Sequence, residues 1–327
     1  MHLLITGGTG FLGRRVAAIA LTQGHRVRLM GRDFAVVGDL LAAGAEPCKA
    51  DLRDPAAVRR ACAGTDAVIH AGALSAPWGR RRDFFAINVA GTAAVIAGCR
   101  AGGVGRLIYV SSPSVTFTGR DVRDQTEAAP LPRRFASLYS LTKALGEDRV
   151  AAAACDGLAT VIVRPKAIFG PGDNALLPRL LAAARRGRLI RIGDGQNRVD
   201  LTYVDNVAHA LLLALDSPHA IGHTYTITND EHPRLWDVIT AVLRGLGIPT
   251  DLRAVPLPAA FAAATIMEAR ARLTGQEPLL TRYSAAILAR TQTYDIAAAR
   301  RDLGYSPRIT LDEGIARTIA ALKSRES

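Results

Sequence analysis

The chain has 327 residues, of which 49% are hydrophobic and 21% charged, and this balance excludes intrinsic disorder as the main state because enough apolar surface can be buried to offset the ordering entropy. Lys and Arg outnumber Asp and Glu by 41 to 29, which gives a formal net charge of +12. Nucleic-acid grooves interleave basic residues with aromatic ones, but aromatic residues make up only 5% of this chain, so we expect no nucleic acid as a partner.

Strand-like and helix-like segments alternate through the first half of the chain. A helix with apolar residues at helical spacing is expected over residues 82–102. The alternation favours a parallel sheet, because parallel strands need crossovers, and right-handed crossovers produce a doubly wound α/β sheet of the Rossmann type. Short apolar runs predict its strands at residues 3–6, 26–30, 46–50, 67–70, 107–110 and 160–163.

The pattern changes after about Arg164, where Pro165, Pro171 and Pro178 punctuate a loop that also contains glycines. Isolated strands at 201–204 and 223–227 and a final amphipathic helix at 312–322 follow. No linker separates the two parts. We therefore expect a Rossmann domain at 1–165, completed by elements from about 200–230, and a smaller C-terminal α/β substrate lobe at 166–327 that does not fold on its own.

Neither the cysteines nor the apolar segments indicate a metal site or a membrane span. A strand-like run begins at His2 with no signal peptide ahead of it. The uninterrupted apolar stretch 256–267 has about 12 residues, which is too short to cross a bilayer. We predict no metal and a reduced, cytoplasmic protein, since the cysteines are too widely spaced for a zinc site: Cys48, Cys62, Cys99 and Cys155.

Glycines at positions 7, 10 and 13 follow the first predicted strand and precede the first predicted helix. Glycine permits a tight turn and lets the backbone approach a pyrophosphate, while the helix N-terminus offers free amides to the anion. Three such glycines alone are a weak signal, but their place in the chain favours dinucleotide binding. The expected contacts are Gly7, Thr9, Gly10, Phe11, Leu12 and Gly13.

The end of the second predicted strand bears on which dinucleotide binds. Arg32 stands where a guanidinium could pair with a 2′-phosphate, and Arg14 is a second candidate. We therefore expect NADP(H) to be preferred, with NAD(H) as the alternative if both residues are simply solvated. Asp51 and Leu52, after the third strand, suit the adenine edge, although Asp51 could instead cap a helix.

Tyr139 and Lys143 form a YxxxK pair on one face of a predicted helix. A free tyrosine has a pKa of about 10, and a nearby ammonium favours its phenolate, so this pair suits acid–base chemistry. Ser111 and Ser112 follow the fifth predicted strand, at the carboxyl edge where ligands bind in such sheets. The YxxxK pair could instead lie on an exposed helix face without a catalytic role. The two serines could simply bond to the backbone of the turn at the strand end.

The segments TGGTGFLG, YVSS, YSLTK and RPKAIFGPGD occur in an order and spacing that resembles the extended short-chain dehydrogenases/reductases of the NAD-dependent epimerase/dehydratase superfamily. The resemblance implies a catalytic Ser–Tyr–Lys set. Here these residues would be Ser112, Tyr139 and Lys143, with Ser112 chosen because it lies three residues before Val115, and with Ser111 as the alternative.

Further features follow from the same resemblance. It implies cofactor contacts from Ala71, Gly72, Tyr139, Lys143 and Pro165, and a structural role for Asn88. It also implies a homodimer that pairs two long helices, at roughly 82–100 and 135–154.

Further segments are Pro113-Ser114-Val115 and those at 170–174, 193–197 and 203–207. They resemble the 3β-hydroxysteroid dehydrogenase-like branch, and within it bacterial reductases of β-keto acids. The resemblance implies an NAD(P)H-dependent oxidoreductase that interconverts a ketone and a secondary alcohol on a lipophilic substrate, either a β-keto acid or a sterol-like molecule. Trp78, Ser114 and Asn174 are the expected substrate contacts.

Two other functions compete with this one. The first is a sugar-nucleotide epimerase or dehydratase with tightly bound NAD, and the second is a non-catalytic NADP-binding regulatory protein. The predicted helix at 256–273 could line an apolar pocket, make peripheral contact with a membrane, or belong to the core of the lobe.

Overall fold

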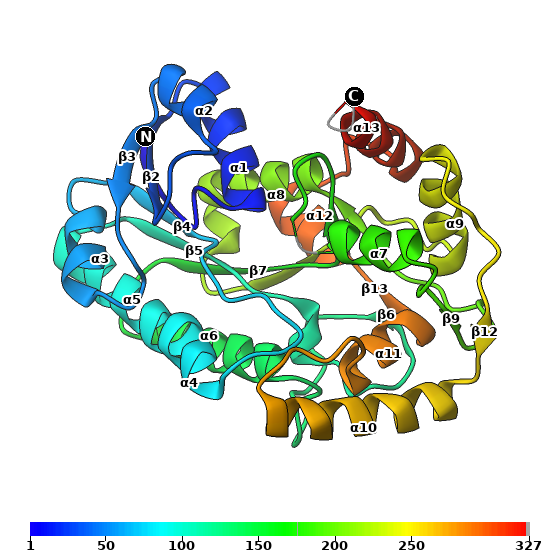
Figure 1. The fold of residues 1–327 in the computed structure, drawn as a ribbon. Coiled ribbons are helices and arrows are strands. Elements are labelled where there is room, and N and C mark those ends of the chain that lie inside the picture. The colour runs from blue at the N-terminus through cyan, green and yellow to red at the C-terminus, as the bar shows by residue number, and fades with distance from the viewer. Residues whose placement is uncertain (175, 325–327) are drawn as a thin grey trace.

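The computed structural model describes residues 1–174 and 176–324 and places a seven-stranded parallel sheet at the centre of the fold (Figure 1). The strand order β11-β7-β5-β4-β1-β2-β3 reverses direction at β1, so the loops that leave β1 and β4 diverge and open a crevice at the carboxyl edge. The predicted doubly wound sheet is confirmed. Its strands are β1 (His2–Thr6), β2 (Arg26–Gly31), β3 (Glu46–Lys49), β4 (Ala67–His70), β5 (Arg106–Val110), β7 (Thr160–Pro165) and β11 (Thr224–Ile227).

Helices cover both faces of the sheet. In β1, Leu3 and Ile5 face one layer and Leu4 the other, because side chains alternate along a strand. The layer with Leu3 holds α1 (Phe11–Thr22), α2 (Gly38–Ala42), α8 (Val204–Asp216) and α12 (Ala297–Leu303). The layer with Leu4 holds α3 (Pro55–Cys62), α5 (Gly91–Gly102) and α6 (Leu138–Cys155).

The helix predicted at 82–102 is continuous but not uniform. It comprises α4 (Arg81–Phe84), a π-helical turn η1 (Phe85–Ala90) and α5. In the described part of the chain, Arg81–Gly102 is the one helical stretch with the length and apolar composition to cross a bilayer, and 56% of its apolar window is buried inside the fold. It packs against α3 and α6, as a core helix does.

Short strand pairs and helices build the rest of the molecule. The strand predicted at 223–227 is β11 and forms an edge of the main sheet, whereas the one predicted at 201–204 is β10 and pairs outside it. The pairs are β8 (Ile168–Phe169) with β10 (Thr202–Tyr203), β9 (Arg191–Ile192) with β12 (Ala254–Val255), and β6 (Val122–Gln125) with β13 (Gln292–Tyr294). The helices are η2 (Pro113–Val115), α7 (Leu176–Arg185), η3 (Pro218–Ala220), α9 (Leu235–Gly245), α10 (Leu257–Thr274), α11 (Arg282–Ala289) and α13 (Leu311–Lys323).

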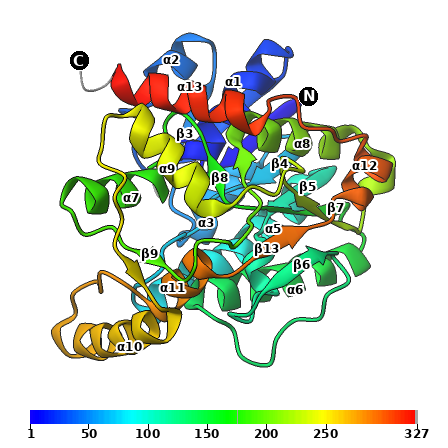
Figure 2. The ribbon, with the colours of Figure 1, turned by 90° about the vertical axis from the view of Figure 1, so that its right-hand side faces the viewer.

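Helix α10 lies at the outer edge of the molecule (Figure 2). Its small residues Ala260, Ala264 and Ala271 are buried, while Ile266 is 71% exposed and Leu273 is 89% exposed. Of the alternatives for this helix, membership of the core therefore holds for its small residues and for Leu257, which packs against a buried cluster, but not for Ile266 and Leu273. The small residues allow close packing on α11.

Candidate active site

The glycine loop between β1 and α1 can be built only with glycine at two of its positions. Gly7 has φ +67°, and a Cβ there would lie 2.7 Å from the Gly72 Cα. A Cβ on Gly13 would lie 2.2 Å from the Gly7 carbonyl oxygen. No side chain caps the N-terminus of α1, which begins after Gly10. The loop therefore presents the uncapped end of a helix to the crevice, as an anion site requires.

Charged residues gather where β2 and β3 end. The Asp51 carboxylate accepts hydrogen bonds from the Arg53 backbone amide (2.9 Å) and guanidinium (2.7 Å). Hydrogen bonding to the Arg53 side chain, assisted by the charges of Arg53 and Arg32, lowers the pKa of Asp51 to about 2. Arg32 is exposed, and Arg14 is half-buried in the first turn of α1. Arg53 could not be identified from the sequence, since an arginine in a loop of an Arg-rich chain belongs to no motif.

Lys143 and Tyr139 occupy the same face of α6, which begins at Leu138, three residues later than predicted, because the Ser137 hydroxyl caps it by accepting from the Ser140 amide (3.0 Å). The Lys143 Nζ donates to the Val110 carbonyl (2.6 Å) and lies 3.8 Å from the centroid of the Tyr109 ring. Burial lowers the pKa of Lys143 to about 7.

Three hydroxyl groups meet at Tyr139. Burial raises the pKa of its phenol, while side-chain hydrogen bonding to Ser75 and Ser112 acts in the opposite direction. The expectation that Lys143 lowers this pKa is therefore wrong for the net shift, because desolvation of the phenolate outweighs every other effect. Of the two serines left open above, Ser112 faces the phenol. Ser75 was missed because it lies in the loop after β4, where no motif marks it.

A buried asparagine holds that loop in place. The Asn88 Oδ1 accepts from the Leu74 amide (2.7 Å), and its Nδ2 donates to the Leu74 carbonyl (3.1 Å) and to Thr142 Oγ1 (3.0 Å). These bonds join the loop that carries Ser75 to the helix that carries Tyr139. Asn88 lies in the π-helical turn η1, and such turns often occur beside functional sites.

Next to the phosphate loop, a buried histidine links two elements. The His70 ring bridges Thr6 (2.7 Å) and Thr92 (3.1 Å), and burial together with the charge of Lys143 lowers its pKa to about 3. The ring is therefore neutral at ordinary pH. Ala71 and Gly72 follow directly at the carboxyl end of β4, and a Cβ on Gly72 would lie 3.0 Å from the Leu52 side chain.

The predicted substrate contacts lie at different depths. Trp78 is half-buried and Ser114 is buried, whereas Asn174 is exposed. Pro165 is buried at the end of β7. Tyr283 of α11, which the sequence analysis missed, lies within reach of Ser114 and Ser140 for hydrogen bonding. Its position is explained only by the packing of α11, which is far from the YxxxK motif in sequence.

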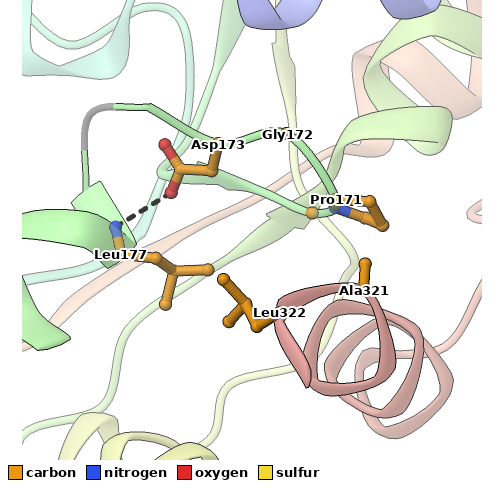
Figure 3. Close-up of a pocket in the computed structure, with 7 residues that line it drawn as sticks. Pro171, Gly172, Asp173, Leu177, Ala321 and Leu322 are labelled. Atoms are coloured by element: carbon orange, nitrogen blue, oxygen red, sulfur yellow. Dashed lines mark hydrogen bonds between the residues drawn. The ribbon is translucent and has the colours of Figure 1, made fainter. Parts of the chain in front are cut away.

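The loop after β8 approaches the phosphate loop. A Cβ on Gly172 would lie 3.8 Å from the Phe11 ring, and the Asp173 carboxylate accepts from the Leu177 amide (2.9 Å), which ties the loop to α7. Figure 3 shows the small hollow that this loop forms with Leu322 of α13. The loop around Gly172 thus reaches the first residue of α1.

Known proteins are similar to this chain over most of its length. A model of the 3-beta hydroxysteroid dehydrogenase/isomerase family matches residues 4–258. A 2-alkyl-3-oxoalkanoate reductase of Stenotrophomonas maltophilia is 41% identical over 98% of this chain and 99% of its own length. A 3beta-hydroxysteroid-dehydrogenase/decarboxylase of Arabidopsis thaliana is 34% identical over 97% of this chain and 78% of its own. A crystal structure of a short-chain dehydrogenase/reductase superfamily protein from Agrobacterium tumefaciens with bound NAD has a TM-score of 0.76 at 25% identity, and the match covers 100% of this chain and 98% of the other.

Proposed function

The chain belongs to the 3-beta hydroxysteroid dehydrogenase/isomerase family and is an NAD(P)-dependent oxidoreductase that acts on CH–OH and C=O groups, and from this membership we propose that it reduces a lipophilic β-keto acid with NADPH. The observation that carries the proposal is the cluster at Tyr139, where Ser75 and Ser112 face a phenol one helical turn from Lys143. This cluster lies at the carboxyl edge of the sheet, where ligands of doubly wound folds bind.

The residues of this chain fit a nicotinamide dinucleotide. Gly7 and Gly13 leave no room for a Cβ, so the backbone of the turn packs tightly, and the uncapped α1 offers its amides to a pyrophosphate. Lys143 would hold the ribose next to the nicotinamide. When bound, the cofactor supplies the hydride that the reaction transfers.

In the proposed mechanism, Tyr139 donates its proton to the carbonyl oxygen of the substrate as the alkoxide develops. Burial keeps the phenol protonated, which is the form that reduction requires. Ser112 holds the same oxygen and polarises the carbonyl, with Ser75 as a second hydroxyl at the phenol. Asn88 keeps Ser75 in position through the two hydrogen bonds to Leu74.

The preference for NADPH is supported by how the charges at β2 and β3 are paired. The Asp51 carboxylate, which is expected at the adenine edge, is already paired with Arg53, so its charge is largely balanced. The exposed Arg32 beside it offers a planar guanidinium to a 2′-phosphate. Arg14 is the second candidate, from the first turn of α1.

The names of the relatives support the substrate class. One relative is named for a 2-alkyl-3-oxoalkanoate, which is a β-keto acid, and the other combines steroid dehydrogenation with decarboxylation. An alkanoate carries a carboxylate, and a decarboxylase removes one. Both names therefore indicate a substrate with a carboxyl group on an apolar skeleton. In this chain, the buried Phe117 packs against Tyr283, whose hydroxyl lies near the hydroxyl cluster, and so supplies apolar surface there.

A panel assay tests the proposal. Oxidation of NADPH and of NADH would be followed with a long-chain 2-alkyl-3-oxo acid, a 3-ketosteroid and a UDP-sugar. We expect NADPH consumption with the oxo acid. Turnover of the UDP-sugar with no net NADPH consumption would favour an epimerase, and NADPH binding without turnover of any substrate would favour a regulatory protein. Equal use of NADPH and NADH would remove the role proposed for Arg14 and Arg32.

A further inference from the structure

Tyr283 brings a second phenol from the substrate lobe to the catalytic hydroxyls. Its ring packs edge-on against Phe117, with centroids 6.3 Å apart and an interplanar angle of 74°. Its hydroxyl lies within hydrogen-bonding reach of Ser114 and Ser140, and it is close enough to Tyr139 for their charges to interact. Ser140 directly follows Tyr139 in α6. Tyr283 belongs to α11, so the two phenols approach the site from different parts of the chain.

The backbone around Tyr283 is held on both sides. The Thr281 hydroxyl caps α11 by accepting from the Ser284 amide (2.9 Å). The buried Glu268 of α10 accepts from the Arg282 amide (2.7 Å) and from its Nε (3.0 Å). A side chain between two such anchors has a defined direction, which binding sites require of the residues that touch a ligand.

Two buried hydroxyl groups beside Tyr283 lack hydrogen bonds of good geometry within the described residues. One is the Ser114 Oγ, and the other is the Tyr294 Oη, whose residue is only 3% exposed and interacts electrostatically with Tyr283. A buried donor without an acceptor costs about 1–3 kcal/mol. Such groups therefore call for an acceptor that is supplied from outside the chain.

The hydroxyls thus form two serine–tyrosine pairs side by side. Ser112 faces Tyr139, and Ser114, two residues further along the same loop, faces Tyr283. A β-keto acid also carries two oxygen-bearing groups close together, since its carboxylate is attached to the carbon next to the ketone. The pair of Ser112 and Tyr139 matches the ketone oxygen. The pair of Ser114 and Tyr283 is available for the carboxylate.

Building on the function proposed above, we propose that Ser114 and Tyr283 bind the carboxylate of the substrate and that Tyr283 selects β-oxygenated acids over simple ketones. The two hydroxyls donate to the carboxylate oxygens, and Tyr294 adds a third donor behind them. The carboxylate in turn fixes the orientation of the ketone at Tyr139. No covalent step is added to the mechanism, because these residues bind and orient only.

The test uses the oxidation direction, because 3-hydroxy acids are stable whereas 3-oxo acids lose carbon dioxide spontaneously. NADPH formation would be measured with a long-chain 3-hydroxy acid and with the secondary alcohol of the same chain that lacks the carboxyl group. A hydrogen bond to a charged group contributes about 1.5–3 kcal/mol. Tyr283→Phe and Ser114→Ala should therefore each lower kcat/KM for the acid by about 10- to 100-fold and change it less than about twofold for the alcohol.

Tyr225→Phe is the matched control, since the Tyr225 hydroxyl bonds to Asp302 at the sheet edge, away from this site. An equal loss for acid and alcohol in Tyr283→Phe would overturn the inference, and so would no loss for the acid. If the wild type oxidises neither substrate, the function proposed above is wrong. Calorimetry then measures the affinity of the NADP⁺-loaded proteins for the 3-hydroxy acid. Equal affinities of wild type and Tyr283→Phe would refute the carboxylate site.

Discussion

The chemistry at the scale of single residues depends on the phenol of Tyr139. Replacing it in Tyr139→Phe removes the proton donor but keeps the ring, so kcat should fall by about 100-fold or more. NADPH affinity, measured by fluorescence titration, should stay within about twofold, because the phenol contributes little to dinucleotide binding in comparison with the glycine loop. Retention of turnover within tenfold of wild type would contradict the assigned role.

The buried ammonium of Lys143 gives a second prediction at this scale. Burial lowers its pKa to about 7 in the fold, whereas an unfolded lysine titrates near 10.4. Between these values the folded protein binds fewer protons than the unfolded one, so this residue makes the free energy of unfolding rise with pH, by up to about 1.4 kcal/mol per pH unit. Urea unfolding of the cofactor-free protein from pH 7 to 9.5 should show this slope reduced in Lys143→Met.

Lys49→Met controls for the loss of a positive charge, because Lys49 is exposed on β3. This variant should keep the slope of the wild type. Identical slopes in Lys143→Met and wild type would show that the Lys143 ammonium is not desolvated in the fold.

The sequence identified the residues of the site that stand in motifs and missed the residues that reach it from elsewhere. Tyr139 and Lys143 are recognisable because a spacing of four places them on one helix face. Ser75 and Tyr283 are not, since a loop held by Asn88 and a helix anchored by Glu268 bring them in. The direction of the Tyr139 pKa shift also needed the structure, because burial depends on the whole fold.

At the scale of elements, the close contact between α6 and β5 requires glycine at position 146, because no side chain fits there. A Cβ on Gly146 would lie 2.1 Å from the Tyr109 hydroxyl. Gly146→Ala should therefore lower the free energy of unfolding by about 1–3 kcal/mol through overpacking. The same displacement of α6 should lower kcat, because Tyr139 and Lys143 belong to this helix. Urea unfolding and steady-state kinetics measure the two effects.

Gly38→Ala is the comparison, because a Cβ on Gly38 meets nothing within 4 Å and this residue begins α2. The higher helix propensity of alanine should leave that variant as stable as wild type or slightly more stable. If Gly146→Ala unfolds at the same urea concentration as Gly38→Ala, the close packing of α6 on Tyr109 is incorrect.

Elements with a clear apolar pattern could be predicted, and those without one could not. The buried strands β1 and β4 are runs of apolar residues and were located within a residue or two. The two-residue strands β8, β9 and β12 are too short to show any period, and their pairing is set by tertiary packing. The π-helical turn at Phe85–Ala90 was also invisible, because its sequence has the same apolar spacing as the α-helix around it.

For the whole molecule, we propose a homodimer formed through the outer faces of α5 and α6. These neighbouring helices expose small apolar residues, Ala97 and Ala101 on α5 and Ala151 and Ala152 on α6. Small side chains let helices from two copies approach closely. Light scattering after size exclusion should give the mass of a dimer for wild type and of a monomer for Ala97→Arg combined with Ala152→Arg. A monomeric wild type would refute the proposal.

The order of strands in the sheet also affects how this chain is made. Synthesis delivers β7 by residue 165, yet its neighbour at the sheet edge, β11, emerges only some 60 residues later. Until then, a nascent chain exposes β7 as an unpaired edge, which is the kind of surface that recruits other strands and aggregates. Once β11 is in place, the Glu127 carboxylate accepts from the Thr226 amide (2.6 Å) and covers part of the new edge. A fragment cut after residue 165 would keep the glycine loop and lose this protection.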